Sequence, residues 1–139
     1  IVMHPGDPDD LNGAGGDILE HVRAFFEKKT TEAEQRGVNK NRLCFDPGIG
    51  FGKTNEENFA LIANPEKLRV PGTALLMAAS RKRVIGAVCG NPPFEDRMAG
   101  TVAAHTASVL FGADMVRAHD TFEAVQAARV ADAIKQFRK

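Results

Sequence analysis

The sequence predicts an α/β fold in which short parallel strands alternate with helices. Four short apolar runs are each followed by a segment with apolar residues at helical spacing. The runs lack polar alternation, as expected of strands buried on both faces of a parallel sheet. An open doubly wound sheet and part of a (β/α)8 barrel both fit this order. Because a full barrel takes roughly 250 residues, the 139 residues would form about half of one.

The first strand–helix unit is predicted from the start of the chain. Residues 1–3 form an apolar run that a proline–glycine turn ends. Asp17, followed three residues later by Glu20, is typical of a helix start in which side chains cap free backbone N–H groups. The predicted helix runs to about Arg36, and Gly37 ends it.

The second unit follows the same pattern over a shorter stretch. Residues 43–45 are predicted as a strand, and Asp46 with a following proline and glycine ends it. Thr54 with Glu57 predicts a capping box at the start of a short helix. Pro65 is expected to stop or redirect that helix.

The last two units complete the alternation. The third strand is predicted at residues 74–77, and Ser80 begins a basic helical turn after it. A long Ala-rich helix is predicted at residues 95–111 and a fourth strand at residues 114–118. Asp120 is expected to cap the final helix.

The composition fits one globular domain and argues against several partners. Hydrophobic residues make up 43% and charged residues 26%, unlike a disordered chain. Eighteen Lys and Arg balance eighteen Asp and Glu, which argues against nucleic acid binding. No apolar run approaches the ~20 residues that a membrane span needs. Cys44 and Cys89 lack paired spacing and are predicted to be reduced, buried thiols of a cytoplasmic protein.

Polar residues follow all four predicted strands. Because the carboxyl ends of parallel strands meet at one edge of a sheet, we expect these side chains to form a site there. They are Met3 and His4, Asp46 with a glycine-rich loop, Ser80-Arg81-Lys82, and Arg117 with His119.

The loop after Asp46 ends in Gly-Lys-Thr, but it is not a nucleotide-binding loop. A phosphate-binding loop of that type needs a glycine where Pro47 stands, and the glycine spacing also fails the dinucleotide fingerprint. What remains is an acid at a strand end and glycines that allow close backbone approach to a ligand. A glycine-rich turn with Asp46 as a local cap fits the residues equally well.

Two other groups of cations predict anion binding. Arg81 and Lys82 stand at a predicted helix start, where cations are unfavourable unless something negative lies among them; a solvated basic face is the alternative. Arg117 and His119 lie on one side of an extended strand and predict an oxyanion or phosphate clamp. His105, in mid-helix, is interpreted as a satisfied structural histidine, and no spacing matches a structural metal site.

These blocks, in this order, resemble the dihydropteroate synthase family. Residues 97–104 also resemble that family's penultimate helix, so the resemblance covers essentially the whole chain. It implies a (β/α)8 barrel that condenses 6-hydroxymethyl-7,8-dihydropterin diphosphate with 4-aminobenzoate and releases diphosphate. Since the chain opens inside an apolar run without an initiator methionine, we expect residues 1–139 to be a partial pterin-binding barrel domain, its C-terminal half, with the first half absent.

The resemblance also implies roles for individual residues. Asp46 would accept from the N–H groups of the pterin, Lys82 would meet its acceptors, and Arg117 would stack on its face; these three are the expected catalytic residues. Arg117 and His119 would reach the diphosphate. Ser80 and Phe51 would lie beside the aminobenzoate, and Met3 would border the pterin. Mg2+ is implied on the substrate's diphosphate, and a homodimer is implied as well.

The sequence departs from the family pattern at two places. Ala78 stands where the family usually has glycine, and the loop after His4 is one residue short. Two other functions remain open: the pterin-binding domain of a corrinoid-dependent methyltransferase, and a non-catalytic half-barrel scaffold. We expect residues 1–139 alone to be inactive or nearly so.

Overall fold

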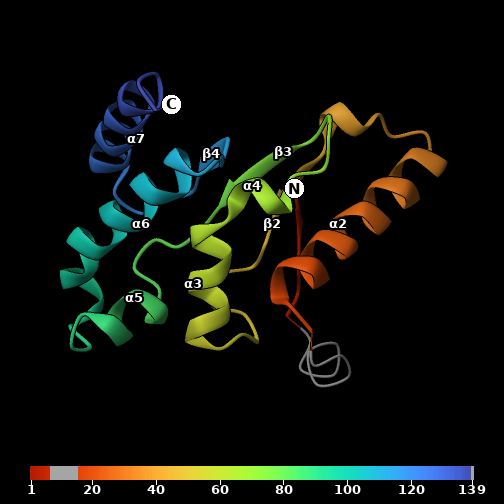
Figure 1. The fold of residues 1–139 in the computed structure, drawn as a ribbon. Coiled ribbons are helices and arrows are strands. Elements are labelled where there is room, and N and C mark those ends of the chain that lie inside the picture. Colours follow the sequence, from red (N-terminus) through yellow and green to blue (C-terminus); the bar gives the residue numbers. More distant parts are fainter. Residues whose placement is uncertain (7–15, 139) are drawn as a thin grey trace.

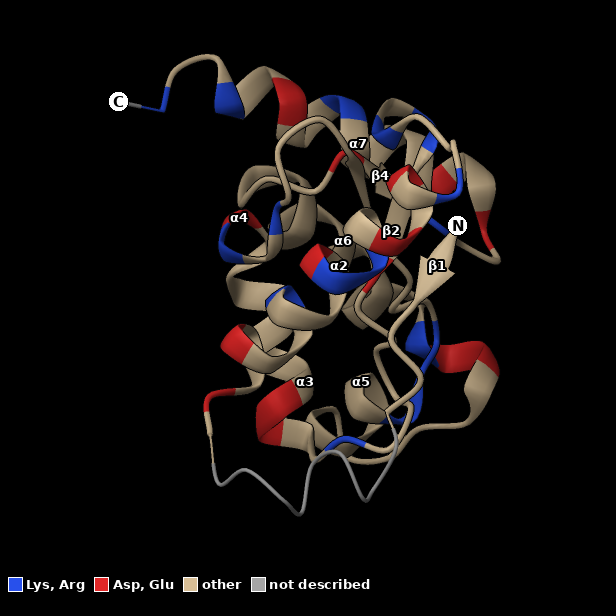
Figure 2. Ribbon diagram, turned by 90° about the vertical axis from the view of Figure 1, so that its right-hand side faces the viewer, with Lys and Arg blue, Asp and Glu red and all other residues tan. Residues whose placement is uncertain are grey.

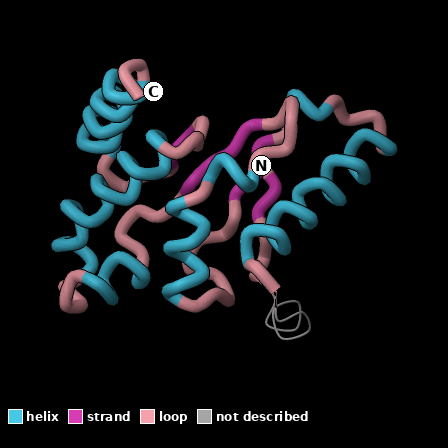
Figure 3. The backbone as a smooth tube through the Cα atoms, viewed as in Figure 1, coloured by secondary structure: helices cyan, strands magenta, loops and turns pink. Residues whose placement is uncertain are grey.

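The computed structural model describes residues 1–6 and 16–138, and its centre is a parallel sheet of four strands. The strands are β1 (Val2–Met3), β2 (Cys44–Asp46), β3 (Ala74–Met77) and β4 (Met115–Val116). Each strand pairs with the one before it in the chain, in the order β1-β2-β3-β4. This is the order of neighbouring barrel strands, because the strand order of a doubly wound sheet reverses. The predicted parallel α/β fold is confirmed (Figure 3).

Helices follow every strand, as predicted. They are α2 (Ile18–Gln35), α3 (Asn55–Ala63), α4 (Pro65–Leu68), α5 (Arg83–Val88), α6 (Met98–Leu110) and α7 (Thr121–Lys135), with the 3-10 turns η1 (Lys40–Arg42) and η2 (Phe94–Arg97). Helix α2 lies along one flank of the sheet and α6 and α7 along the other, with α3, α4 and α5 between them (Figure 1). No described helix is long and apolar enough to cross a membrane.

Two of the three predicted helix caps form. Asp17 accepts a main-chain N–H in the first turn of α2, and Thr54 and Glu57 make both bonds of a capping box on α3. Asp120 stands at the N-cap of α7 but makes no cap hydrogen bond. Its two carboxylate oxygens accept instead from the guanidinium of Arg81, so the predicted cap is wrong at that position.

Pro65 redirects the helix as expected: α3 ends at Ala63, and Pro65 begins α4 at its first position, where its missing N–H costs nothing. Several other predicted boundaries differ. Helix α5 begins at Arg83 instead of Ser80, because Arg81 has a φ of 55° that no right-handed helix can contain. The long helix divides into η2 and α6, and β4 is shorter than predicted.

The core lies between the sheet and the helices. The rings of Phe26 from α2 and Phe45 from β2 stack with centroids 4.5 Å apart, and both side chains are buried. Leu61 of α3 and Leu75 of β3 belong to the same cluster. Both cysteines are free, but only Cys44 is partly buried; Cys89, just after α5, is exposed, so the prediction of two buried thiols is wrong.

His105 is buried in α6, as expected of a structural histidine. Neither ring nitrogen has a hydrogen-bond partner among the described residues, so the expectation of a satisfied ring is wrong. Burial lowers the pKa of this imidazole, and the ring is therefore held neutral.

Acidic and basic segments are mixed over the helices in view in Figure 2. This distribution agrees with the formal net charge of zero.

Candidate active site

Two adjoining hollows lie where the loops after β2, β3 and β4 meet. The larger has a volume of about 660 Å3, and the smaller about 340 Å3. Ser80, Lys82 and His119 line both. The larger is completed by Gly50, Phe51, Lys53, Asn55, Asn58, Arg81, Arg83, Val84, Ala87, Asn91, Phe94 and Arg97, and the smaller by Ala78, Arg117 and Ala118. Five of the six predicted strand-end positions past β1 line a hollow, as the barrel topology requires; the sixth, Asp46, does not.

The smaller hollow lies beside a buried acid. Asp46 at the end of β2 is only 2% exposed. One carboxylate oxygen accepts from the backbone N–H of Gly48 at 2.8 Å, and the other lies 3.8 Å from a guanidinium nitrogen of Arg117. Asp46 is therefore both a local turn cap and a negative charge facing a cation. The interpretation of Asp46 as a local cap is confirmed.

The glycine loop approaches protein backbone rather than open space. A Cβ at Gly48 would collide with the carbonyl of His4, and one at Gly52 would collide with the carbonyl of Gly6. These glycines let the loops after β1 and β2 pack backbone against backbone. The expectation that they admit a ligand is therefore wrong for these two positions. Gly50 is different, because its Cβ would meet the Lys82 side chain at 3.2 Å.

Two residues that the sequence analysis did not single out hold this loop. Asn58 of α3 accepts from the N–H of Gly50 at 2.7 Å, and its amide donates to the carbonyl of Thr54 at 2.7 Å. The ammonium of Lys53 donates to the carbonyls of Gly48 and Phe51, both at 3.1 Å. Burial lowers the pKa of Lys53 to about 8. Asn58 sits one turn into an amphipathic helix, where nothing in the sequence distinguishes it from a surface amide.

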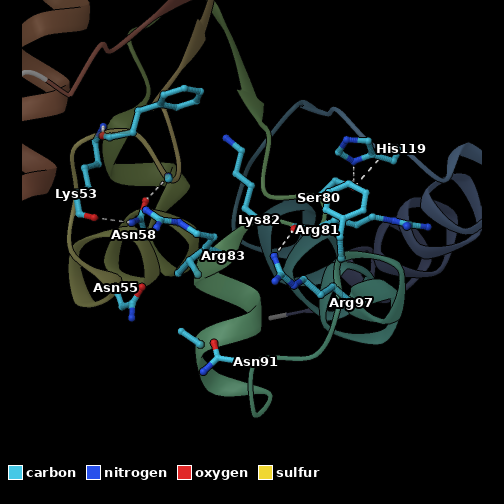
Figure 4. A pocket seen from close by; sticks show the side chains of 15 residues that line it. Lys53, Asn55, Asn58, Ser80, Arg81, Lys82, Arg83, Asn91, Arg97 and His119 are labelled. Atoms are coloured by element: carbon cyan, nitrogen blue, oxygen red, sulfur yellow. Dashed lines mark hydrogen bonds between the residues drawn. The ribbon is translucent and has the colours of Figure 1, made fainter.

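Lys82 reaches up the middle of the cleft, between Lys53 and Asn58 on one side and Ser80 and His119 on the other (Figure 4). Its ammonium donates to the carbonyl of Ile49 and lies 4.6 Å from the centroid of the Phe51 ring. Burial lowers the pKa of Lys82, opposed by the nearby carboxylate of Asp46. Lys82 is thus a half-buried cation placed where both hollows meet.

Ser80 and His119 form a contact between the ends of β3 and β4. The hydroxyl of Ser80 accepts from the backbone N–H of His119 at 3.2 Å and lies 2.9 Å from ring nitrogen Nδ1. Ser80 is buried, whereas Arg117 is exposed on the rim of the smaller hollow. Two cations and a histidine therefore line a small, open space that suits an anion.

Arg81 and Met3 differ from expectation. The negative group predicted among the cations is Asp120 of the protein itself, which accepts hydrogen bonds from Nε and Nη2 of Arg81. Met3 pairs in register with Asp46 but lines neither hollow.

Comparisons with known proteins show the family of the chain. A family model described as "Pterin binding enzyme" matches residues 1–119. The chain belongs to this family of pterin-binding enzymes. Within it, the chain is similar to dihydropteroate synthases: 36% identical over 137 residues to that of Synechocystis sp., covering 96% of this chain and 47% of the relative, and 34% identical over 135 residues to that of Escherichia coli, covering 95% and 48%.

Solved structures give the same result. The dihydropteroate synthase of Xanthomonas albilineans in complex with 7,8-dihydropteroate superimposes with a TM-score of 0.85 at 36% identity, covering 96% of this chain and 49% of that one. The enzyme of Burkholderia cenocepacia complexed with 7,8-dihydropteroate gives 0.81 at 36% identity, covering 87% and 45%. The chain spans about half the length of the relatives it matches.

Proposed function

We propose that this chain carries part of the active site of a dihydropteroate synthase. The reaction condenses 6-hydroxymethyl-7,8-dihydropterin diphosphate with 4-aminobenzoate to give 7,8-dihydropteroate and diphosphate in folate biosynthesis. The observation that carries the proposal is the meeting of a buried acid, Asp46, a half-buried cation, Lys82, and the pair Arg117 and His119 around two joined hollows. A flat heterocycle with N–H donors, ring acceptors and an anionic tail needs these groups.

In the proposed site, the pterin and its diphosphate occupy the smaller hollow. Asp46 accepts from the N–H groups of the pterin, while Lys82 exchanges the carbonyl of Ile49 for acceptors on the ring. Arg117 lies against the ring face and, with His119, holds the diphosphate.

The arylamine then enters from the larger hollow. Ser80 and Phe51 line it, and we propose that the ring of 4-aminobenzoate lies beside them. The carbon–oxygen bond to diphosphate breaks first, and its electron pair leaves with the diphosphate. The arylamine nitrogen adds to the resulting carbocation and loses a proton. The protein orients the two partners and stabilises the charge on the leaving group.

Mg2+ enters this proposal only as a partner of the substrate. The described residues contain no group of three or more His, Cys, Asp or Glu side chains that could hold a metal ion. These described residues therefore form no metal-ligand cage of their own. Diphosphate oxygens are suitable Mg2+ ligands, and no step above depends on the ion.

Calorimetry with 6-hydroxymethyl-7,8-dihydropterin tests the proposal. We expect the chain to bind this pterin, and Asp46→Asn to abolish binding, because the amide presents a donor to the N–H groups of the ring. Asp132→Asn, on exposed α7, is the control and should bind normally. Normal binding by Asp46→Asn would place the site elsewhere. Preference for methyltetrahydrofolate would favour the methyltransferase instead, and no pterin binding at all would favour a scaffold.

A turnover assay on the same preparation tests a second proposal. We expect these 139 residues alone to condense the substrates slowly or not at all, since they span about half the length of the related enzymes. A rate similar to that of intact enzymes would contradict this.

We further propose that the protein is cytoplasmic and forms homodimers. Helix α7 exposes apolar side chains, among them Phe122, Val130 and Ile134, and such a face favours association. Sedimentation showing only monomers at micromolar concentration would contradict the dimer.

A further inference from the structure

The turn between β3 and α5 contains a residue in a strained conformation. Arg81 has a φ of 55°, in the left-handed region that side chains with a Cβ disfavour. This conformation leaves Ser80 and Lys82, on either side of it, lining both hollows. A strained residue of this kind persists only where the surrounding structure holds it in place.

The backbone N–H, the carbonyl and the guanidinium of Arg81 each make hydrogen bonds with another part of the chain. Its backbone N–H donates to the hydroxyl of Thr101 at 2.9 Å, and its carbonyl accepts from Arg97 at 3.1 Å. Its guanidinium makes two hydrogen bonds with Asp120, at 2.8 and 2.6 Å. The turn after β3 is therefore fixed to α6 and to the segment that leads into α7.

These contacts lead directly to the predicted anion site. Asp120 follows His119, and Ser80, which precedes Arg81, holds both the backbone and the ring of His119. Phe94 adds a third contact: its ring centroid lies 5.2 Å from the guanidinium of Arg81 and 5.3 Å from the ring of His119. Ser80 therefore contacts His119, and the next residue, Arg81, contacts Asp120. These two contacts join the turn after β3 to the turn after β4.

The pair of Arg81 and Asp120 is not free to bind a ligand. Their side chains are only 16% and 19% exposed, and each satisfies the charge of the other. Hydrogen bonding to Asp120 raises the pKa of Arg81, and the same bonds lower the pKa of Asp120, so both stay ionised. Whatever Arg81 does for a ligand, it does through its neighbours.

We propose that Arg81 is a positioning residue. Its ion pair with Asp120 holds His119 against Ser80, on the side of the cleft that faces Lys82, so that His119 and Lys82 contact the same anion. The inference rests on the proposed function, because it takes the diphosphate group of the substrate as that anion.

A double-mutant cycle with inorganic diphosphate as the probe tests it. By calorimetry, Arg81→Ala and Asp120→Ala should each weaken diphosphate binding about tenfold, the size typical of residues that orient a ligand-binding side chain. The double variant should be no weaker than either single one, because both remove the same contact. Exchanging the two residues, Arg81→Asp with Asp120→Arg, should restore part of the affinity.

The control is a second arginine–aspartate pair in the same chain. Arg69 and Asp114 lie 2.9 Å apart, and neither lines a hollow. Arg69→Ala should lower the thermal midpoint without changing diphosphate affinity. If Arg81→Ala does not fold, Arg81→Lys replaces it and should weaken binding about threefold, since lysine keeps the charge but loses the paired donors. Wild-type affinity in the folded Arg81 variant, or losses that multiply in the double variant, would overturn the proposal.

A second measurement separates this inference from the proposed function. If the wild type does not bind diphosphate, the proposed function fails. The positioning of His119 can still be tested by hydrogen exchange. The backbone N–H of His119 donates to Ser80, so its hydrogen exchange reports that contact. Arg81→Ala should speed this exchange about tenfold relative to Arg69→Ala. Equal exchange in the two variants would overturn the positioning role.

Discussion

The loops after β2 and β3 both hold side chains of the site in place, but they are fixed by different contacts. Both leave the carboxyl end of a strand, both contain left-handed residues, and both carry side chains of the site. The loop after β2 uses glycines, at Gly48, Gly50 and Gly52, and packs backbone on backbone. The turn after β3 uses one arginine and holds it with charge and hydrogen bonds. The first loop is therefore fixed by steric exclusion and the second by electrostatics.

The largest effect is expected where a side chain enters the packed loop. In Gly52→Ala the Cβ would collide with the carbonyl of Gly6, at a φ of 59° that alanine disfavours. We expect a loss of about 3 kcal/mol in the free energy of unfolding by urea. Gly37→Ala is the control, because Gly37 also has a positive φ but nothing within 4 Å, and should lose only about 1 kcal/mol. Equal losses would show that the loops do not press together.

A smaller effect is expected from loosening the turn after β3. Thr101→Val keeps the shape of the side chain but removes the hydroxyl that accepts from Arg81 and donates to the carbonyl of Arg97. Because the backbone N–H of Arg81 loses its acceptor, the free energy of unfolding should fall by about 1.5 kcal/mol. Thr31→Val, whose exposed hydroxyl bonds only within α2, should change stability by less than about 0.5 kcal/mol. An unchanged free energy of unfolding in Thr101→Val would show that this hydroxyl does not stabilise the turn.

The two loops should also differ in their response to pH. Lys53 has a pKa of about 8 in the folded chain against 10.5 ordinarily, so the unfolded chain binds more protons between these values. Stability of the loop after β2 should therefore rise with pH above 8, by about 1 kcal/mol after allowing for partial exposure. Lys53→Met should lose this rise in urea unfolding at pH 7, 8.5 and 10. A rise that persists in the variant would show another group to be responsible.

The turn after β3 should respond in acid instead, and more weakly. Hydrogen bonds from Arg81 lower the pKa of Asp120 below its ordinary 3.8. Its contribution is therefore present above pH 3.8 and is lost as the pH falls through the lower, folded value. The difference in free energy of unfolding between wild type and Asp120→Asn should shrink as the pH falls from about 4 to about 2, and it should shrink at pH 6 when salt is added. A stability difference that changes with neither pH nor salt would show that the contribution of Asp120 is not electrostatic.

Much of the fold could be predicted from local patterns. Apolar runs and the capping residues Asp17 and Thr54 lie in the elements that their chemistry favours, because caps and strand burial act over a few residues. The misses have a common cause. In the sequence Asp120 has the position of a helix cap, and only its contact with Arg81, 39 residues away, gives its carboxylate a different partner. Lys53 and Asn58 were missed because their partners are backbone carbonyl and N–H groups. Every residue type carries such groups, so the sequence does not show which of them will be contacted.

The sequence by itself determined the alternation of strands and helices, and the type of polar residue at each strand end. Hydrophobic periodicity and the parallel sheet are enough for that, since every strand end must open on the same edge. The tertiary structure decided which cations stay available. It pairs Arg81 with Asp120, presses the glycine loop against the turn after β1, and leaves Lys82, Arg117 and His119 around the hollows. Charge pairing over long separations depends on distances that only the folded chain sets.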